Sequence, residues 1–285
     1  MNELFKHLKL VALVGVLFAW ASGWCVVEAE SQSLEYEDGS FYVGEVVDSS
    51  PNGYGTMMYP NGGQYQGDWV NGKAEGHGIW QKNNGDRYEG DFQSGKMNGQ
   101  GIYSYPDGVR YEGSMVDGEK KGYGVITWPN GDRYEGEFNQ DWAEGQGIYN
   151  YADGTHYEGT VVDGERSGYG VMTWPNGDRY EGEFLKDQFY GHGVFVYVDG
   201  RRYEGSCVNG RRDGMGTLTS PAGFSYQGEW KQDLPNGQGR YNYPDGSCYE
   251  GQVVDGRRQG WGSFVFPNGQ RMEGEWENDA PKKTK

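Results

Sequence analysis

Two segments of the chain carry the glycine and lysine spacing of a phosphate-binding loop. They are Gly67 to Ala74 and Gly90 to Met97, and each has a Gly-Lys pair near its end. Neither segment has the final Ser or Thr that would contact magnesium. The same glycine spacing recurs throughout the chain, so we interpret both segments as parts of a repeat and not as nucleotide-binding loops.

The histidines and the acidic turns suggest little further chemistry. His77 and His192 lie in Gly-x-Gly pairs five repeats apart, and His156 lies in a column of arginines. The spacing places no second ligand or base partner within reach of any of them. The Asp and Asn residues of the turns do not have the spacing of an EF-hand loop, and hairpin turns already account for them. We therefore predict no catalytic group, no metal site and no cofactor.

Seven basic residues form the candidate ligand-binding set. They occur in loops of every second repeat, and the intervening loops carry acids instead, such as Asp141 and Glu144. We expect basic spots along one edge of the array, roughly 19 Å apart. Such spots could bind phosphate head groups or an acidic partner; the alternative is that they only keep the loops soluble. The set comprises Lys120, Lys121, Arg166, Arg211, Arg212, Arg257 and Arg258.

A repeat built around Tyr-Glu-Gly positions all of these residues. The triplet Tyr134-Glu135-Gly136 has copies every 23 residues, with a glycine three residues before each Tyr and a Gly-x-Gly pair further along. Self-similarity at such a period indicates a repeat array. We expect the triplet residues to be structural, among them Tyr88, Gly90, Tyr111, Gly113, Tyr134, Gly136, Tyr157, Gly159, Tyr180, Gly182, Tyr203 and Gly205.

Each repeat reads as one β-hairpin. In the middle copy, residues 124–129 are rich in β-branched and aromatic side chains, as strands are. Asn130-Gly131 is a strong hairpin signal, and Asp132 to Phe138 forms the returning strand. We expect Asn139 to Glu144 to be a loop. The fold class is therefore all-β: an elongated, twisted antiparallel meander of about eleven hairpins, resembling a solenoid.

The two-residue period of a strand separates the side chains into two faces. Tyr134, Gly136 and Phe138 share one face, which we expect to hold an aromatic ladder with glycines between the rings. The opposite face carries columns of Arg and Glu, two residues apart, that keep the array soluble. A single-layer sheet has no second layer over its apolar face, so part of the ladder could stay exposed and recruit a partner.

Composition supports this assignment and excludes other classes. The chain has 51 glycines and a formal net charge of −17. Strict periodicity and regular aromatic residues argue against disorder, and the acidity argues against a nucleic-acid partner. Cys207 and Cys248 lie two repeats apart, too far for a disulfide, and Cys25 belongs to the N-terminal segment.

The N-terminal segment, residues 1–29, has the order of a secretory signal peptide. Lys6 and Lys9 precede the apolar run from Leu10 to Trp20, and small residues follow. We favour a cleaved signal peptide, and an uncleaved single-pass anchor is the alternative, since Leu10 to Val27 is just long enough to span a membrane. The array occupies residues 30–278, and a short basic tail occupies residues 279–285.

The repeated string Tyr-Pro-Asp/Asn-Gly-x-x-Tyr-Glu-Gly-x-x-x-x-Gly-x-x-x-Gly-x-Gly resembles the MORN (membrane occupation and recognition nexus) repeat over residues 34–278. The resemblance implies a twisted antiparallel β array that serves as a scaffold. It also implies protein binding, homodimer formation or phosphoinositide binding, since each of these is attributed to the family. No kinase or methyltransferase segment accompanies the array.

From these observations we expect a non-enzymatic scaffold for protein–protein interaction, exported or membrane-tethered, with an unknown protein partner or a second copy of itself. The alternative function is binding of phospholipid or phosphoinositide head groups through the basic loops.

Overall fold

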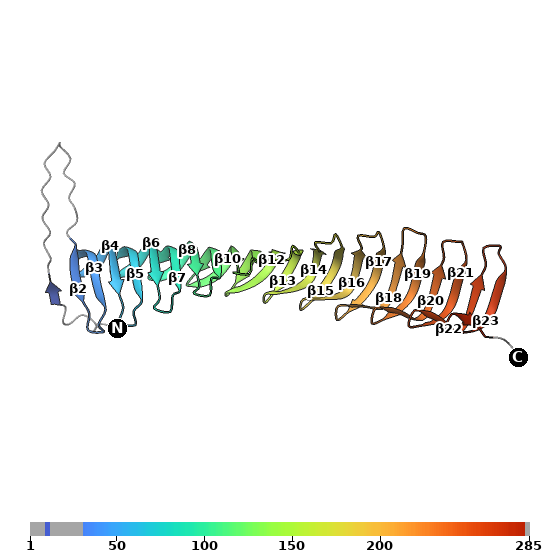
Figure 1. The fold of residues 1–285 in the computed structure, drawn as a ribbon. Coiled ribbons are helices and arrows are strands. Elements are labelled where there is room, and N and C mark those ends of the chain that lie inside the picture. The colour runs from blue at the N-terminus through green and yellow to red at the C-terminus, as the bar shows by residue number, and fades with distance from the viewer. Residues whose placement is uncertain (1–8, 12–30, 283–285) are drawn as a thin grey trace, which may run out of the picture. The chain divides into compact units, whose positions relative to one another are not determined.

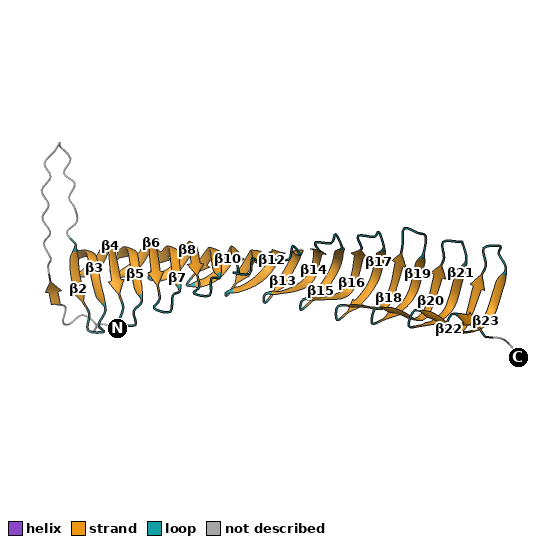
Figure 2. Cartoon of the chain, viewed as in Figure 1, coloured by secondary structure: helices purple, strands orange, loops and turns teal. Residues whose placement is uncertain are grey.

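The structure is a computed structural model that describes residues 9–11 and 31–282. These residues form strands and turns and contain no helix (Figure 2). The chain divides into two units, Met1–Trp142 and Ala143–Lys285. In each unit, strands that are consecutive in the chain lie side by side (Figure 1).

In the first unit every strand pairs antiparallel with the next one in the chain. The prediction of an all-β antiparallel meander is confirmed. The strands are β1 (Lys9–Val11), β2 (Gln32–Glu35), β3 (Phe41–Val47), β4 (Ser50–Met58), β5 (Gln64–Val70), β6 (Lys73–Gln81), β7 (Arg87–Gln93), β8 (Lys96–Ser104), β9 (Arg110–Val116), β10 (Glu119–Thr127) and β11 (Arg133–Asn139).

The second unit continues the same order, again with consecutive antiparallel pairing. Its strands are β12 (Trp142–Asn150), β13 (His156–Val162), β14 (Glu165–Thr173), β15 (Arg179–Leu185), β16 (Gln188–Val196), β17 (Arg202–Val208), β18 (Arg211–Thr219), β19 (Ser225–Lys231), β20 (Leu234–Asn242), β21 (Cys248–Val254), β22 (Arg257–Val265), β23 (Arg271–Glu277) and β24 (Ala280–Pro281).

Two kinds of turn alternate along each unit. One kind is five residues long, as at 174–178, where the Trp174 N–H donates to the Asp178 carbonyl at 2.9 Å. The other turns have only two residues, both with positive φ, as at Lys186 (49°) and Asp187 (66°). Turns of this type match the twist of the flanking strands.

The prediction of a loop from Asn139 to Glu144 is therefore wrong. The structure has a two-residue turn there, Gln140 (φ 48°) and Asp141 (φ 70°), and the next strand already begins at Trp142. Asp and Asn tolerate positive φ because their short side chains bond locally. Sequence reasoning recognised glycine as a turn residue but missed Gln-Asp.

The core of each unit is a column of tyrosines, one in each hairpin. The Tyr180 ring is buried, and its hydroxyl donates to the Glu183 carbonyl at 2.9 Å. From Phe92 onward, in every second hairpin a large ring lies edge-on between two of the tyrosines, as Phe184 does, with centroids 5.1 Å from Tyr157 and 5.2 Å from Tyr180. The expected ladder is confirmed, and its tyrosines are Tyr42, Tyr65, Tyr88, Tyr111, Tyr134, Tyr157, Tyr180, Tyr203, Tyr226 and Tyr249.

Paired glycines give each tyrosine ring a flat backbone to lie on. Gly182 of β15 stands opposite Gly193 of β16. A Cβ on Gly182 would lie 2.5 Å from the Cα of Gly193, and a Cβ on Gly193 would meet the Tyr180 ring. Contacts this short are forbidden, so the triplet glycine is required by close approach. The other predicted structural glycines, Gly90, Gly113, Gly136, Gly159 and Gly205, each face a glycine of the next or preceding strand in the same way.

We predict that alkaline pH unfolds the chain through this tyrosine column. Burial raises the pKa of Tyr88, Tyr157, Tyr226 and Tyr249 to about 12, from an ordinary value of about 10. The folded state thus favours the neutral phenols. Their contribution to stability is complete below about pH 10 and is lost as the pH rises through about 12.

A titration that follows phenolate absorbance and circular dichroism together tests this prediction. We expect the buried phenols to ionise only as the strand signal is lost. Ionisation of all the tyrosines near their ordinary pKa, with the strand signal intact, would contradict it.

The N-terminal prediction falls mainly outside the described residues. Of residues 1–29, only Lys9–Val11 is described, as strand β1 paired with β2. Of the predicted basic tail, residues 279–285, the structure describes residues 279–282. No helix of sufficient length and apolarity to cross a membrane occurs in the described part of the chain.

Candidate functional site

The seven predicted basic residues lie in strands and not in loops. They occupy the first three positions of β10, β14, β18 and β22. The predicted loops are shorter than the sequence indicates, because each of these turns has only two residues and the next strand begins directly after it. The structure separates the seven into two groups, one inserted among the core rings and one exposed.

Four of the seven are partly buried and paired with an aspartate. The Arg212 side chain is only 20% exposed, and its Nε lies 3.2 Å from Oδ1 of Asp233. The same Oδ1 accepts the Arg212 backbone N–H at 3.0 Å, and Arg212 Nη2 donates to the Asp233 carbonyl at 2.9 Å. The equivalent pairs are Lys120–Asp141, Arg166–Asp187 and Arg258–Asp279.

These paired cations also lie over core rings. The Arg212 guanidinium carbon is 4.4 Å from the Trp230 ring centroid and 5.5 Å from that of Tyr203. Opposite Arg212 in the sheet stands a small residue, Cys207, where alternate hairpins have a large ring. The guanidinium therefore fills space that the small residue leaves, as the cation–π attraction of arginine favours.

This arrangement explains why the sequence alternates between successive repeats. A hairpin whose core residue is not aromatic supplies the base, and the two-residue turn of the next hairpin supplies the aspartate. Sequence reasoning missed these aspartates as partners of the bases. The available signal was the second turn residue, which from Gly118 onward is Gly and Asp in alternate two-residue turns. The aspartates are Asp141, Asp187, Asp233 and Asp279.

We predict that Arg212→Ala lowers the free energy of unfolding by about 1–2 kcal/mol, because it removes a cation–π contact and aliphatic packing over Trp230. The matched control is Arg211→Ala at the adjacent, exposed residue, with an expected change within about 0.5 kcal/mol. Chemical denaturation of both variants measures the difference. Equal losses for the two variants would contradict the structural role of Arg212.

The remaining three bases, Lys121, Arg211 and Arg257, are exposed. Arg257 makes a long contact, 3.4 Å, to the Asn278 side chain. Since four of the seven predicted ligand-binding residues are occupied within the fold, the cationic set available to a ligand is smaller than the sequence indicated.

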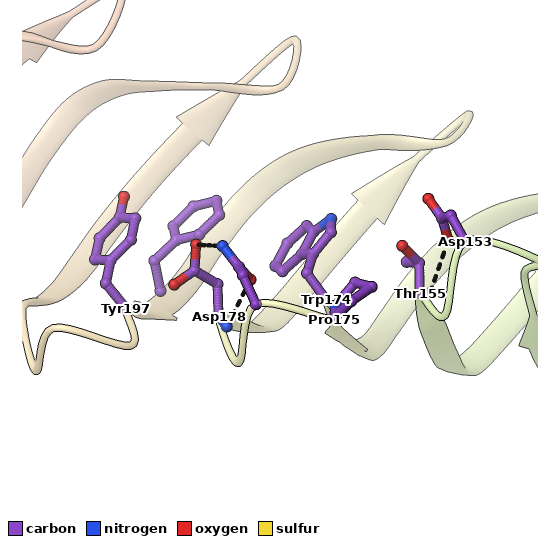
Figure 3. Close-up of a pocket in the computed structure, with 8 residues that line it drawn as sticks. Asp153, Thr155, Trp174, Pro175, Asp178 and Tyr197 are labelled. Atoms are coloured by element: carbon purple, nitrogen blue, oxygen red, sulfur yellow. Dashed lines mark hydrogen bonds between the residues drawn. The ribbon is translucent and has the colours of Figure 1, made fainter.

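An aromatic groove in the second unit is the candidate binding site. It has a volume of about 460 Å³ and lies where successive strands enter the five-residue turns. Figure 3 shows Trp174 and Tyr197 on successive hairpins, with Asp178 between them. Both rings are half-buried, unlike the fully buried tyrosine column. The groove is lined by Asp153, Thr155, Trp174, Pro175, Asn176, Asp178, Phe195 and Tyr197.

The groove is rigid because its polar groups are fixed by the turns. Asp178 Oδ1 accepts the Val198 N–H at 2.8 Å, and its Oδ2 accepts a bond from the Asn176 side chain at 2.9 Å. Asp153 accepts the Thr155 N–H at 2.8 Å, and this hydrogen bond lowers the pKa of Asp153. Asp153 is therefore in its charged form at neutral pH, and both carboxylates line the groove as hydrogen-bond acceptors.

The opposite face of each unit carries exposed aromatic side chains beside carboxylates. Tyr169 is 57% exposed, and its hydroxyl donates to Glu181 at 2.7 Å, where Arg179 also pairs at 2.5 Å. The Arg and Glu columns of this face form ion pairs, although exposed pairs add little stability. The pairs are Arg87–Glu89, Arg110–Glu112, Arg133–Glu135, Arg179–Glu181, Arg202–Glu204 and Arg271–Glu273.

His77 and His192 have carboxylate neighbours, which corrects the expectation that no partner lies in reach. His77 Nδ1 lies 3.6 Å from Asp91, and His192 Nε2 lies 3.9 Å from Glu204. All four side chains are exposed to solvent. In the described ranges, 9–11 and 31–282, no group of three or more potential metal ligands comes together.

A protein-family model described as the MORN repeat matches ten consecutive segments between residues 42 and 271. The chain belongs to the MORN-repeat family. The matched segments are 42–64, 65–87, 88–110, 111–133, 134–156, 157–179, 180–201, 203–224, 226–248 and 249–271.

Each matched MORN segment begins at a tyrosine of the buried column. The resemblance stated from the sequence is thus confirmed. The eleventh of the expected hairpins includes Met272-Glu273-Gly274, which lies outside the matched segments. Its strand β23 still pairs with β22, and Trp276 is buried at this end.

The two phosphate-loop segments are parts of MORN repeats. The first, Gly67 to Ala74, runs from β5 through the turn Asn71-Gly72 into β6. A phosphate-binding loop instead joins a strand to a helix, and the described residues contain no helix.

Solved structures that match the chain include the TCP10 domain of Danio rerio CPAP in complex with a peptide of Danio rerio STIL. It is 13% identical, with a TM-score of 0.35, and the match covers 88% of this chain and 97% of that one. A second is the Drosophila melanogaster SAS-4 (dCPAP) TCP domain in complex with a proline-rich motif of Ana2, 12% identical with a TM-score of 0.36, covering 67% and 99%. At such TM-scores neither likeness carries an argument about function. A comparison with curated proteins found no match.

Proposed function

We propose that this MORN-repeat chain is a non-enzymatic scaffold that binds another protein. The observation that supports the proposal most is the set of half-exposed aromatic side chains at the five-residue turns of the second unit. Trp174 and Tyr197 lie in an open groove there, and no further layer of the described residues covers them. Half-exposed aromatic rings with fixed polar neighbours are typical of protein-binding surfaces.

Co-purification of the full chain from its native compartment, followed by cross-linking and mass spectrometry, tests this function. We expect a stoichiometric protein partner whose cross-links map to the repeats. A chain that purifies alone, and that gives no cross-link to any other protein after cross-linking in place, would refute the scaffold function.

Self-association is the simplest form of this function, with a second copy as the partner. Light scattering on residues 30–285 across a range of concentrations tests it. A concentration-dependent rise in mass supports a homodimer, and a strict monomer at high concentration removes it.

We also propose that the chain is exported, with residues 1–29 as a cleaved signal peptide, or held at the membrane if they are not cleaved. The basis is the order of Lys6, Lys9, the apolar run and the small residues. N-terminal sequencing of the protein from its native source distinguishes the two: a new N-terminus near residues 21–29 supports cleavage, and an intact Met1 supports the anchor.

Binding of anionic lipid head groups is the alternative function, and the exposed bases are the observation in its favour. Lys121, Arg211 and Arg257 are exposed and lie at the starts of β10, β18 and β22. The test is liposome flotation with phosphoinositide-containing vesicles, comparing the wild type with the triple Lys121→Glu, Arg211→Glu, Arg257→Glu variant. Flotation that the variant loses supports lipid binding; unchanged flotation, or none in the wild type, ends it.

A further inference from the structure

One row of rings in the second unit recurs at the same place in successive hairpins. It occupies the first position of each five-residue turn, directly after the strand. Trp174 and Tyr197 are the members that line the groove, and Pro175 follows Trp174. The row comprises Tyr151, Trp174, Tyr197, Tyr243 and Phe266, with Ser220 in the remaining hairpin.

These rings are accessible, and neighbouring rings hold them in place. The Tyr197 ring stacks at 6.1 Å and 13° on Phe195, and the Trp174 ring meets Phe189 edge-on at 6.0 Å. Tyr151 stacks in the same way on Tyr149. One edge of every ring therefore packs within the sheet, and the other stays half-exposed. A rigid ring can bind a ligand without a large loss of conformational entropy.

The spacing of the row fits one kind of peptide. Equivalent positions in successive hairpins are two strands apart, about 9.6 Å. A polyproline II helix repeats every three residues, and at about 3.1 Å per residue its turn is about 9.3 Å. A peptide in this conformation, lying across the strands, would present the same face to each successive ring. A fully extended strand repeats its face about every 6.7 Å and falls out of step with the row.

The charges beside the rings select among such peptides. Asp153 and Asp178 line the groove as hydrogen-bond acceptors, and the chain carries a net charge of −17. Bases near the row are paired with aspartates. Arg201 stacks on the Tyr197 ring at 5.0 Å and is paired with Asp199 at 2.7 Å. Arg166 lies 5.9 Å from the Tyr151 ring and is paired with Asp187 at 2.7 Å. The carboxylates therefore dominate the groove and favour a basic peptide.

We propose that this row binds a polyproline II segment of the partner protein, with prolines between the rings and Lys or Arg facing Asp153 and Asp178. Aromatic-lined grooves bind such helices because the peptide is already ordered before it binds. This inference rests on the protein-binding function proposed above and names the partner segment by its conformation and charge.

The first experiment uses the intact chain and three synthetic peptides in isothermal titration calorimetry. They are (Pro-Pro-Lys)5, the flexible (Gly-Ser-Lys)5 with the same charge, and (Pro-Pro-Glu)5 with the same conformation and opposite charge. Fifteen residues of polyproline II span about 46 Å, about five hairpins. We expect (Pro-Pro-Lys)5 to bind at least tenfold more tightly than either control. Equal binding by (Gly-Ser-Lys)5 would show that charge alone causes binding and would overturn the inference. No binding by (Pro-Pro-Lys)5, or equal binding by (Pro-Pro-Glu)5, would also overturn it.

The second experiment locates the site. We expect Tyr197→Ala and Trp174→Ala each to weaken binding of (Pro-Pro-Lys)5 at least fivefold. The matched control is Trp261→Ala on the opposite face, where the side chain is 67% exposed, and it should leave binding unchanged. Circular dichroism verifies that each variant is folded, and the peptide comparison on the wild type stands if one is not. An equal loss in Trp261→Ala would overturn the assignment.

The two proposals fail in different ways. A chain that co-purifies with a protein partner but does not distinguish the three peptides refutes this inference and leaves the scaffold function standing. A chain with no protein partner refutes the function itself.

Discussion

Gly251→Ala should be among the most destabilising single substitutions in the chain, lowering the free energy of unfolding by about 1–3 kcal/mol or more. A Cβ at this position would lie 2.5 Å from the Cα of Gly262, 2.6 Å from the Trp261 carbonyl oxygen and 2.7 Å from the Tyr249 hydroxyl. Two of these three atoms belong to backbone, so the strands β21 and β22 must separate to admit one methyl group. Chemical denaturation, together with hydrogen exchange of β21 to β23, measures the loss.

The chain contains its own control for this substitution. Gly274 holds the same place in the next copy of the triplet, but a Cβ there would meet no atom within 4 Å. Gly274→Ala should therefore be neutral, or stabilising by about 0.4–1 kcal/mol through the unfolded state. Similar losses for the two variants would show that the triplet glycine is not required by close approach.

Tyr180→Ala should lower the free energy of unfolding by about 3–5 kcal/mol, the range for removing a buried aromatic side chain. The Tyr180 ring is fully buried and lies 4.3 Å from Phe189 and 4.5 Å from Phe195, centroid to centroid. Its loss leaves a cavity over the glycine pair that the rigid strands cannot close. In a repeat array each repeat is stabilised mainly by its neighbours. Hydrogen exchange should therefore show the loss of protection first in β15 and β16.

Two further variants serve as controls. One measures the contribution of the Tyr180 hydroxyl, and the other measures the effect of removing an exposed tyrosine. Tyr180→Phe keeps the ring but loses the hydrogen bond to the Glu183 carbonyl, and should lower stability by about 0.5–1.5 kcal/mol. Tyr169→Ala removes an exposed tyrosine of the opposite face and should change stability by at most about 0.5 kcal/mol. If Tyr169→Ala were as harmful as Tyr180→Ala, the buried column could not be the element that holds the array together.

The fold was predictable because the side-chain spacing, the turn residues and the repeat period all indicate the same β-hairpin. Tyr134 and Gly136 recur with strand spacing, turn residues recur between the strands, and a matching family model covers residues 42–271. The failed prediction concerned the connection at Asn139 to Glu144. Its Gln140-Asp141 turn has the positive φ angles that glycine adopts in other turns. The turn propensities of Gln and Asp alone do not identify a two-residue turn.

The candidate site was less predictable because charge does not reveal exposure. Arg211 and Arg212 are adjacent and identical in type, yet one is exposed and the other lies over Trp230. The sequence located both bases and the alternation of the repeats. It did not show that Asp233, 21 residues later, would be brought to Arg212 by the next hairpin.

The sequence by itself determined the repeat, the hairpins, the pairing of tyrosine with glycine and the family, because all of these follow from side-chain periodicity along one chain. Only the tertiary structure decided which bases are part of the core and which rings stay open. Those outcomes depend on contacts between successive hairpins, as where Arg212 fills the space beside Cys207, and on the lack of a second layer over Trp174 and Tyr197 in the described residues. Burial is a property of neighbours in space, and a period in the sequence does not specify it.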